Sequence, residues 1–335
     1  MNKGRLESLI ESFRKRRIMV VGDIMLDEYL EGNVERISPE APIPVVNLVN
    51  NRGRDVRLGG AANVFQNLVS LGDREMLLCG VVGDDADGSF LQKKIAAMGV
   101  DTSGLVVDAE RPTTVKTRII AHNQQVIRLD REERSPLSEQ SRKKLVAFIQ
   151  KKLGSLDALI FSDYEKGVIT SQLLREVLPL ARNKKVLIAV DPKFSNFRHF
   201  NNVTIVVPNR KEASGFIRHE INSDDDALMA AHTIKESLCC ECVLLKLGER
   251  GMLIADSNDK KVFIETAAEQ VYDVTGAGDT VIGTLVLART AGASWEEAAR
   301  IANVAAGIVI HYIGTSAVTT DQLKRALIEN RMPEP

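Results

Sequence analysis

Short apolar runs alternate along this chain with longer segments in which apolar residues recur at helical spacing. The runs predict β-strands and are Ile18–Val21, Met76–Cys79, Ala158–Phe161, Val186–Val190, Val203–Val207 and Val243–Leu247. Several are apolar throughout, which is typical of parallel strands covered on both faces. The alternation predicts an α/β fold: a doubly wound, mostly parallel sheet flanked by helices.

The segments with helical spacing lie between these runs. They are Ala61–Leu71, Gly88–Met98, Ser138–Leu153, Ser171–Arg182, Asp225–Leu238, Ala277–Arg289, Ser294–Ile313 and Thr320–Glu329. A further amphipathic helix is predicted near the N-terminus from the spacing of Leu6, Leu9, Ile10 and Phe13. That first segment lacks the apolar core of a signal peptide.

Two segments interrupt the alternation with strand patterns that no helix separates. Residues 29–58 contain Pro39, Pro42 and Pro44 and then an apolar run, and residues 113–130 alternate apolar and polar side chains. Both predict a small β-sheet that forms a lid over a substrate or a contact between two copies, so a homodimer through the lid strands is expected. The prediction is a single domain over residues 1–335 with lid strands inserted at about 29–58 and 113–130.

The composition is that of an ordinary soluble protein. The 335 residues are 44% hydrophobic and 27% charged with a net charge of −1, which gives no support for nucleic-acid binding. No apolar run approaches the roughly 18 residues of a membrane span. Cys239, Cys240 and Cys242 are crowded together without a second pair, so buried apolar fillers are favoured over a zinc site. A reducing, cytoplasmic location is expected.

The stretch from Val271 to Gly283 carries the clearest chemistry. Its two glycines, Gly276 and Gly278, open an apolar helical segment, where bare N–H groups and the helix dipole favour an anion. Asp279 follows directly, and an acid beside an anion cradle suits phosphoryl transfer to a hydroxyl. A simple helix start with Asp273 or Thr275 as N-cap is the plainer interpretation. The glycine spacing excludes a Rossmann fingerprint, and no P-loop pattern occurs.

Polar residues cluster where the predicted strands and the first lid segment end. The clusters are Gly22–Asp27, Gly59–Asn63, Ser162–Gly167, Asp191–Lys193 and Pro208–Glu212. Each alone is typical of turns and N-caps. In an open α/β sheet, however, the carboxyl ends of the strands meet at one edge, where ligands bind. Together the clusters predict side chains for a polyol and carboxylates such as Glu212 for a metal–nucleotide complex.

These stretches together resemble the ribokinase-like (PfkB) sugar kinases, from about Ile18 to Leu327. The two family signatures match Asp273-Val274-Thr275-Gly276-Ala277-Gly278-Asp279-Thr280 and Gly59-Gly60-Ala61-Ala62-Asn63. The resemblance implies a ribokinase-like fold and ATP with Mg²⁺, and in some relatives a monovalent cation such as K⁺. It makes Asp279 the catalytic base and the backbone of Gly276, Ala277 and Gly278 the anion hole.

The other roles implied by the resemblance fall into three groups. Sugar hydroxyls would be held by Asp23, Asp27, Gly59, Gly60, Asn63 and Asp163. The nucleotide would lie near Asn209, Glu212, Lys246, Gly248 and Asn303, with Glu212 also near Mg²⁺. A monovalent cation would lie at Asp273 and Thr275.

Within the family, four stretches are similar to the kinases that phosphorylate D-glycero-β-D-manno-heptose 7-phosphate at O1. They are residues 22–27, 36–46, 123–130 and 162–167. That reaction gives heptose 1,7-bisphosphate on the route to ADP-heptose and the lipopolysaccharide core. In many bacteria a nucleotidyltransferase follows this kinase; here no His-x-Gly-His motif occurs, and a stand-alone kinase and the kinase part of a longer protein both stay open.

A substrate that already carries a phosphate needs cations at its far end. The available cations are Arg36, Arg57, Lys116, Arg118, Arg128, Lys166 and Lys193, of which two or three are expected to contact the phosphate. The substrate-binding set is completed by Gln125. The alternatives are a kinase of the same family for ribose, fructose or another sugar phosphate, and a non-catalytic nucleotide-binding scaffold.

Overall fold

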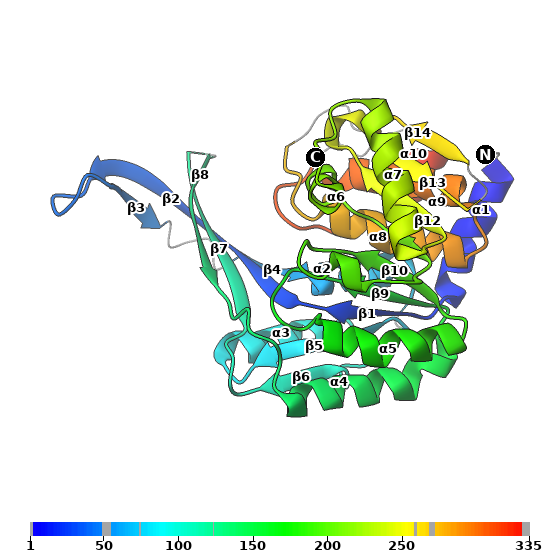
Figure 1. Ribbon diagram of the computed structural model, residues 1–335. Coiled ribbons are helices and arrows are strands. Elements are labelled where there is room, and N and C mark those ends of the chain that lie inside the picture. The colour runs from blue at the N-terminus through cyan, green and yellow to red at the C-terminus, as the bar shows by residue number, and fades with distance from the viewer. Residues whose placement is uncertain are drawn as a thin grey trace.

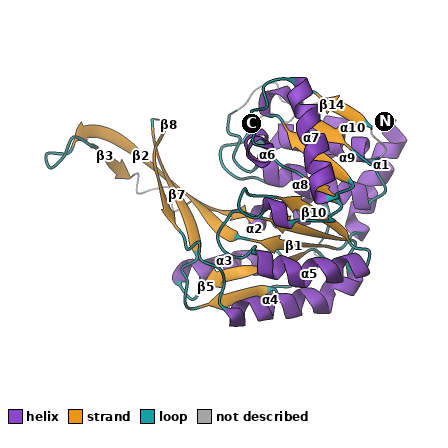
Figure 2. Cartoon of the chain, in the orientation of Figure 1, coloured by secondary structure: helices purple, strands orange, loops and turns teal. Residues whose placement is uncertain are grey.

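A nine-stranded sheet with helices on both faces forms the body of the protein (Figures 1 and 2). The computed structural model describes residues 3–48, 55–73, 75–122, 124–257, 260–267 and 272–329. In these residues the strand order is β14-β13-β12-β11-β10-β9-β1-β5-β6. Pairing is parallel from β12 to β6, whereas β13 runs antiparallel to both of its neighbours. The predicted α/β class is confirmed.

The elements of the body follow the predicted alternation. Its strands are β1 (Ile18–Gly22), β5 (Leu77–Gly83), β6 (Leu105–Asp108), β9 (Ala158–Ser162), β10 (Leu187–Asp191), β11 (Ile205–Val206), β12 (Cys242–Lys246), β13 (Met252–Ala255) and β14 (Lys261–Ile264). Its helices are α1 (Lys3–Ser12), α2 (Ala61–Leu71), α3 (Ala86–Ala96), α4 (Glu139–Lys152), α5 (Ser171–Asn183), α6 (Arg210–Ile217), α7 (Asp224–Leu238), α8 (Ala277–Thr290), α9 (Trp295–Val309) and α10 (Thr320–Ile328).

The strands are apolar throughout because the sheet buries both of its faces. Along β1, Ile18 and Val20 belong to one hydrophobic cluster with residues of α2, α8 and α9, whereas Met19 and Val21 belong to a second cluster with residues of α4, α5 and α7. Successive side chains of a strand point to opposite faces, so each strand supplies both cores. The sheet is thereby held rigidly, and its carboxyl edge is fixed.

A second, smaller sheet forms the lid. Its strands are β2 (Ile24–Ile37), β3 (Pro44–Leu48), β4 (Asp55–Gly60), β7 (Thr114–Ala121) and β8 (Gln124–Arg131), in the order β3-β2-β7-β8 with β4 paired to β2. Figure 1 shows β3 and β8, with the outer parts of β2 and β7, extending away from the body, whereas β4 lies against it. Strand β2 begins buried beside β1 and ends exposed in the lid. The predicted small sheet is confirmed, and its root lies inside the body.

The strand register gives the lid one charged face. Lys116 pairs with Asp130 and Arg118 with Arg128 across β7 and β8, and Asp27 of β2 pairs with Lys116. Directly paired residues lie on the same face of a sheet, as do residues two apart. These residues therefore share a face, and contacts of Lys116 with the body identify it as the face toward the carboxyl edge of the sheet.

Some elements differ from the sequence-based expectation. Helix α6 and strands β6 and β13 were not predicted, because segments of four to eight residues give too little periodicity. Helix α9 ends at Val309 instead of Ile313, since the carbonyl of Ile310 accepts hydrogen bonds from the backbone of Tyr272 and Asp273. Of the predicted segments, residues 49–54, Asn123 and Val271 lie outside the described residues.

The cysteine cluster lies at the start of β12. Cys240 and Cys242 are buried in the core and Cys239 is exposed, all as free thiols. Within the described ranges, no His, Cys, Asp and Glu side chains gather in a group of three that would hold a metal ion. None of the described helices combines the length and apolar character needed to cross a bilayer.

Candidate active site

The predicted anion hole is the start of helix α8. Gly276 is its N-cap with φ of 81°, and a Cβ there would lie 2.7 Å from the Asn63 amide nitrogen. The N–H of Ala277 donates to the carbonyl of Val274 (3.2 Å), while the N–H of Gly278 belongs to the first helical turn and has no intrahelical partner. The helix dipole places partial positive charge at this end, so the turn suits a developing anion.

Asp279 lies directly in this turn and is almost completely buried, with 3% of its surface exposed. Its Oδ2 accepts a hydrogen bond from the Asn63 amide (2.9 Å), and its Oδ1 accepts one from the Tyr164 hydroxyl (2.5 Å). Burial raises the pKa of the carboxyl to about 7, against the two hydrogen bonds. A carboxylate with this pKa is suited to accept a proton near neutral pH.

Two charged residues from the ends of β10 and β12, which flank β11 in the sheet, meet beside the predicted anion hole. Lys246 at the end of β12 donates to Asp191 at the end of β10 (Nζ–Oδ1 2.9 Å). A Cβ at Gly278 would lie 3.2 Å from the same ammonium nitrogen. The Lys246 charge therefore lies at the helix start, where it would attract a phosphate. The Asp191 charge raises the pKa of Asp279, and the Lys246 charge lowers it.

Tyr164 connects Asp279 to the lid and to the α6 side of the site. Its ring has the Lys116 ammonium at 5.6 Å and the Lys193 ammonium at 5.5 Å from the centroid. Burial and the neighbouring Asp279 charge raise the pKa of the Tyr164 hydroxyl well above its usual value, so it stays protonated as a donor. Lys193 also forms an ion pair with Glu212.

Glu212 lies at the start of helix α6. Asn209 is the N-cap, its side chain accepting from the Glu212 N–H (2.9 Å), while the Glu212 carboxylate accepts from the Asn209 N–H (2.8 Å). This capping box and the Lys193 ion pair orient the carboxylate. Mg²⁺ bound to a nucleotide is held mainly by phosphates and waters with one or two carboxylates. The single, oriented Glu212 near Lys193 fits such an ion.

On the lid side, Asp27 and the glycines are packed against each other. Arg118 of β7 donates to Asp27 of β2 (2.5 Å), and both side chains are largely buried. A Cβ at Gly59 would lie 2.2 Å from Asp27 Oδ2, so only glycine leaves room for this carboxylate. Gly60 has φ of 57° and turns the chain from β4 directly into α2, which carries Asn63 to Asp279.

The other two predicted sugar ligands, Asp23 and Asp163, lie close to the same place but are bonded to loops. Asp23 accepts backbone N–H groups of Tyr164 (2.7 Å), Lys166 (3.2 Å) and Val168 (3.1 Å). Asp163 accepts the Asn196 amide and two backbone N–H groups, and burial together with the Asp23 charge raises its pKa to about 7. Both carboxylates therefore shape the loop that presents Tyr164.

The seven candidate phosphate ligands separate into groups. Lys116, Arg128 and Lys166 are electrostatic neighbours; burial lowers the pKa of Lys116, and the charges of the other two lower it further. Lys166 pairs with Glu132 and Arg128 with Asp130, each at 2.8 Å. The others are held elsewhere: Arg118 by Asp27, Arg57 by Asp55 and the Ile313 carbonyl, Lys193 by Glu212.

The remaining predicted residues are more scattered. Arg36 and Gln125 are exposed on lid strands, Arg36 on the part of β2 that pairs with β3 away from the body (Figure 1). Asn303 donates to the Glu265 carbonyl (2.7 Å) beside β14, and Gly248 has φ of 67° after β12. The Asp273 carboxylate accepts hydrogen bonds from Thr275 and from the Gly314 N–H (2.8 Å). A monovalent cation at Asp273 and Thr275 stays a prediction.

Sequence reasoning placed Tyr164 and Asp191 in the polar clusters at the strand ends but gave neither an individual role. The rule that ligands bind at strand ends indicates Asp191, but not its ion pair with Lys246. Tyr164 belongs to a loop whose path depends on buried Asp23, and no local pattern indicates that its hydroxyl reaches Asp279. Its contact with Asp279 is a tertiary one.

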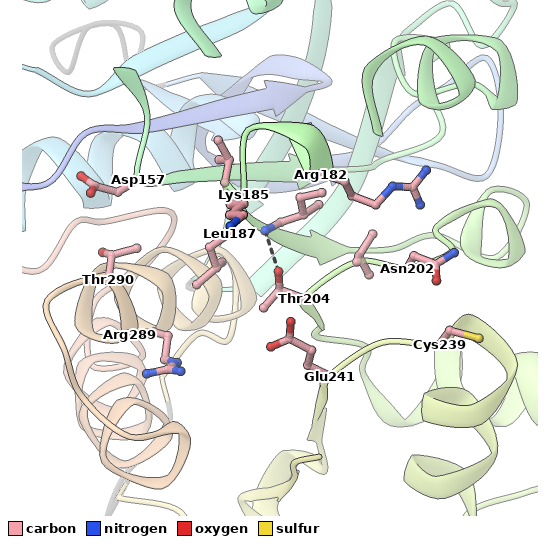
Figure 3. Close-up of a pocket in the computed structure, with 13 residues that line it drawn as sticks. Asp157, Arg182, Lys185, Leu187, Asn202, Thr204, Cys239, Glu241, Arg289 and Thr290 are labelled. Atoms are coloured by element: carbon pink, nitrogen blue, oxygen red, sulfur yellow. Dashed lines mark hydrogen bonds between the residues drawn. The ribbon is translucent and has the colours of Figure 1, made fainter. Parts of the chain in front are cut away.

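A pocket of about 680 Å³ lies at the opposite edge of the sheet (Figure 3). It is lined by residues that precede or begin β10, β11 and β12, among them Lys185, Thr204 and Glu241, together with Arg289 and Thr290 of α8. These are the amino ends of the parallel strands, whereas Asp279 and Lys246 lie at the carboxyl edge. The pocket is therefore separate from the candidate active site.

Comparisons of the sequence with known proteins agree on one family. The family model described as pfkB family carbohydrate kinase matches residues 15–322. The bifunctional protein HldE of Geotalea uraniireducens is 42% identical over 323 residues, covering 96% of this chain and 65% of that protein. HldE of Pelobacter propionicus is 41% identical over 330 residues, covering 98% and 66%. The chain thus spans about two thirds of the length of these curated relatives.

Solved structures share the fold. Phosphofructokinase-2 from Escherichia coli in complex with potassium has a TM-score of 0.75 at 20% identity, covering 92% of this chain and 97% of that one. Ribokinase from Arabidopsis thaliana complexed with ribose and ATP has a TM-score of 0.74 at 18% identity, covering 93% and 99%. At these identities the likeness is one of fold.

The buried Asp279 carboxyl should make the fold less stable as the pH rises. Its folded pKa of about 7 lies above the unfolded value near 3.8. Folded-state protonation therefore favours the fold below the unfolded pKa, and this stabilisation is lost as the pH rises through the folded pKa. Asp279→Asn should increase the free energy of unfolding by about 2–3 kcal/mol more at pH 8 than at pH 5.

Urea denaturation at both pH values measures this difference. Asp225→Asn on α7 is a matched control, because the Asp225 side chain is exposed and water solvates it in both states. If Asp279→Asn increased the free energy of unfolding by the same amount at pH 5 and at pH 8, the raised pKa of Asp279 would be contradicted.

Proposed function

The chain belongs to the pfkB family of carbohydrate kinases, and we propose that it transfers the γ-phosphoryl group of ATP to O1 of D-glycero-β-D-manno-heptose 7-phosphate. The product would be heptose 1,7-bisphosphate, on the route to ADP-heptose and the lipopolysaccharide core. The observation that carries the catalytic part is the buried Asp279 at a helix start beside Lys246. The similarity to HldE proteins over nearly the whole chain supports the choice of sugar.

In the proposed mechanism Asp279 takes the proton of O1 as that oxygen attacks the γ-phosphorus in line, while the bond from this phosphorus to the bridging oxygen breaks and ADP leaves. Charge develops on the transferring group, and the N–H groups at the start of α8 together with the Lys246 ammonium stabilise it. Asn63 holds the second oxygen of Asp279 and so fixes the orientation of the carboxylate. The buried position excludes water that would compete with the sugar.

Mg²⁺ bound to ATP would neutralise phosphate charge and orient the triphosphate. Glu212 is the carboxylate proposed to lie next to it, positioned by the Asn209 cap and the Lys193 ion pair. Lys193 itself would reach the phosphates once its carboxylate partner turns toward the ion.

Mass spectrometry of a reaction with heptose 7-phosphate and Mg-ATP tests the proposal. We expect a bisphosphate heavier than the sugar by one phosphoryl group, with phosphorus NMR locating that group on O1. Asp279→Asn should lower kcat about 10²–10⁴-fold, the range for loss of a general base, with ATP affinity little changed.

Other outcomes separate the alternatives. Activity on ribose or fructose with none on heptose 7-phosphate would remove the heptose and leave a sugar kinase. ATP binding without transfer to any sugar of a panel would favour a non-catalytic nucleotide-binding protein. Near-normal turnover of Asp279→Asn would contradict the base assignment.

We propose that the 7-phosphate binds at Lys116, Arg128 and Lys166. These three cations are electrostatic neighbours on the charged face of the lid and the adjacent loop. Lys116 makes no ion pair within the described residues and lies over the Tyr164 ring, so its ammonium group is the one best able to meet an incoming phosphate. The Tyr164 ring lies between the Lys116 ammonium and Asp279, and a sugar would span a gap of this kind.

Lys116→Met should raise KM for the sugar phosphate about 10- to 100-fold while KM for ATP stays near its original value. The physical reason is the loss of one charge-assisted hydrogen bond. Steady-state kinetics with each substrate varied in turn provide the measurement. Lys144→Met, on the exposed side of α4, is the matched control and should change neither constant. A similar rise in KM for unphosphorylated sugars would show that Lys116 does not act on the phosphate.

We also propose that two copies pair through their lids. The face of β8 opposite the charged one exposes Ile127 (48%) and Leu129 (53%), and the paired strands β2 and β3 expose Ile37 (62%) and Leu48 (48%). Apolar side chains gathered on a protruding sheet are typical of an interface.

Leu129→Asp should convert a dimer to a monomer, because it would bury a charge in that interface. Light scattering after size exclusion at micromolar concentration measures the mass. Met229→Asp, an equally polar change at an exposed apolar residue of α7, should leave the mass unchanged. A monomeric mass for the unaltered chain would end this part of the proposal.

A further inference from the structure

Asp279 makes two side-chain hydrogen bonds, one through each carboxylate oxygen. Oδ2 accepts from the Asn63 amide and Oδ1 from the Tyr164 hydroxyl. A general base needs one oxygen that can face the hydroxyl it deprotonates. Each oxygen keeps a second lone pair, but the carboxylate is almost completely buried, so the sugar reaches it most directly by taking the place of one of the two partners.

Asn63 is held too firmly to move away from Asp279 when the sugar binds. It lies in the first turn of α2, is completely buried, and is in van der Waals reach of Gly276 at the anion hole. The helix begins at Gly60, whose neighbours in β4 are bonded to β2. Movement of the Asn63 amide would require movement of the whole helix start.

Tyr164 is held differently. Its main chain is fixed by the hydrogen bond to Asp23, but its ring is only partly buried and has the ammonium groups of Lys116 and Lys193 over it. Lys116 belongs to the lid, and Lys193 pairs with Glu212. Cation–π contacts of this kind are weak, so a phosphate that attracts either lysine would loosen the ring.

We propose that the Tyr164 hydroxyl occupies the place of the sugar's reacting hydroxyl on Asp279 Oδ1 and is exchanged for it when the sugar binds. The exchange replaces one O–H donor by another, so the buried carboxylate keeps two hydrogen bonds throughout. Until the sugar arrives, the Tyr164 hydroxyl keeps water away from Asp279 Oδ1, the oxygen that would otherwise deprotonate a water molecule for attack on ATP. Tyr164 is thus a positioning residue that limits hydrolysis of ATP, and this inference rests on the proposed kinase function.

The high pKa of Tyr164 agrees with this role. Burial and the Asp279 charge keep the hydroxyl protonated, so it donates to the base and has no free negative charge of its own to activate water. The lid contact through Lys116 also couples the exchange to substrate binding, because the cluster proposed for the sugar phosphate includes the cation that lies over the ring.

Tyr164→Phe tests the inference, since it keeps the ring and removes only the hydroxyl. In the absence of sugar, Mg-ATP hydrolysis should rise about tenfold, the factor that corresponds to one hydrogen bond to a charged group. kcat for sugar phosphorylation should stay within about threefold of the unaltered protein. Lys116→Met, assayed in the absence of sugar, should raise Mg-ATP hydrolysis by a smaller factor, because the Tyr164 ring loses its contact with the lid but keeps its hydroxyl.

Tyr312→Phe is the matched control; its hydroxyl contacts Gln322 on α10, and its removal should leave hydrolysis unchanged. Unchanged ATP hydrolysis in both Tyr164→Phe and Lys116→Met would overturn the inference. So would loss of sugar phosphorylation in Tyr164→Phe without a rise in hydrolysis, which would make the hydroxyl part of the proton path. If no heptose phosphate is turned over by any variant, the proposed substrate fails, while the hydrolysis rates still decide the role of Tyr164.

Discussion

The burial of one carboxylate at a helix start is the constraint on which the rest of the site depends. Asp279 loses most of its water, and the loss is offset by two hydrogen bonds and by Lys246 beside Asp191. Each of these partners comes from a different part of the chain: Asn63 from α2, Tyr164 from the loop after β9, Lys246 from β12. The two-faced core of the sheet is what holds these elements in register.

The two glycine signatures have a common physical purpose here. Gly59 and Gly60 allow β4 to turn into α2 against Asp27, and α2 then delivers Asn63 to the anion hole formed at Gly276. Segments separated by more than 200 residues therefore meet at one carboxylate. The lid strand β4 and the start of α2 are continuous, so the surroundings of Asp27 and those of Asp279 are built from one piece of backbone.

Much of this architecture follows from the sequence. Strands buried on both faces are apolar throughout, which is why the sheet and its carboxyl edge were predictable, and the glycine-rich helix start indicated Asp279. The bonding of Asp23 and Asp163 to backbone N–H groups was not predictable, because it depends on a loop path set by distant residues. The contact of Tyr164 with Asp279 was not predictable for the same reason. Short elements such as β6 and β13, with four residues each, carry almost no periodic signal.

Strand β2 is one uninterrupted run of 14 residues from the centre of the body into the lid. Backbone pairing stiffens this arm, apart from a shift in register with β3 between Val34 and Arg36, so the arm would move by bending and twisting of its paired strands. A slight tilt near Asp27 is magnified along the arm, and a load applied at the tip is felt at its root. Contacts made by the outermost residues of the arm would therefore alter the stiffness of the site without touching any ligand.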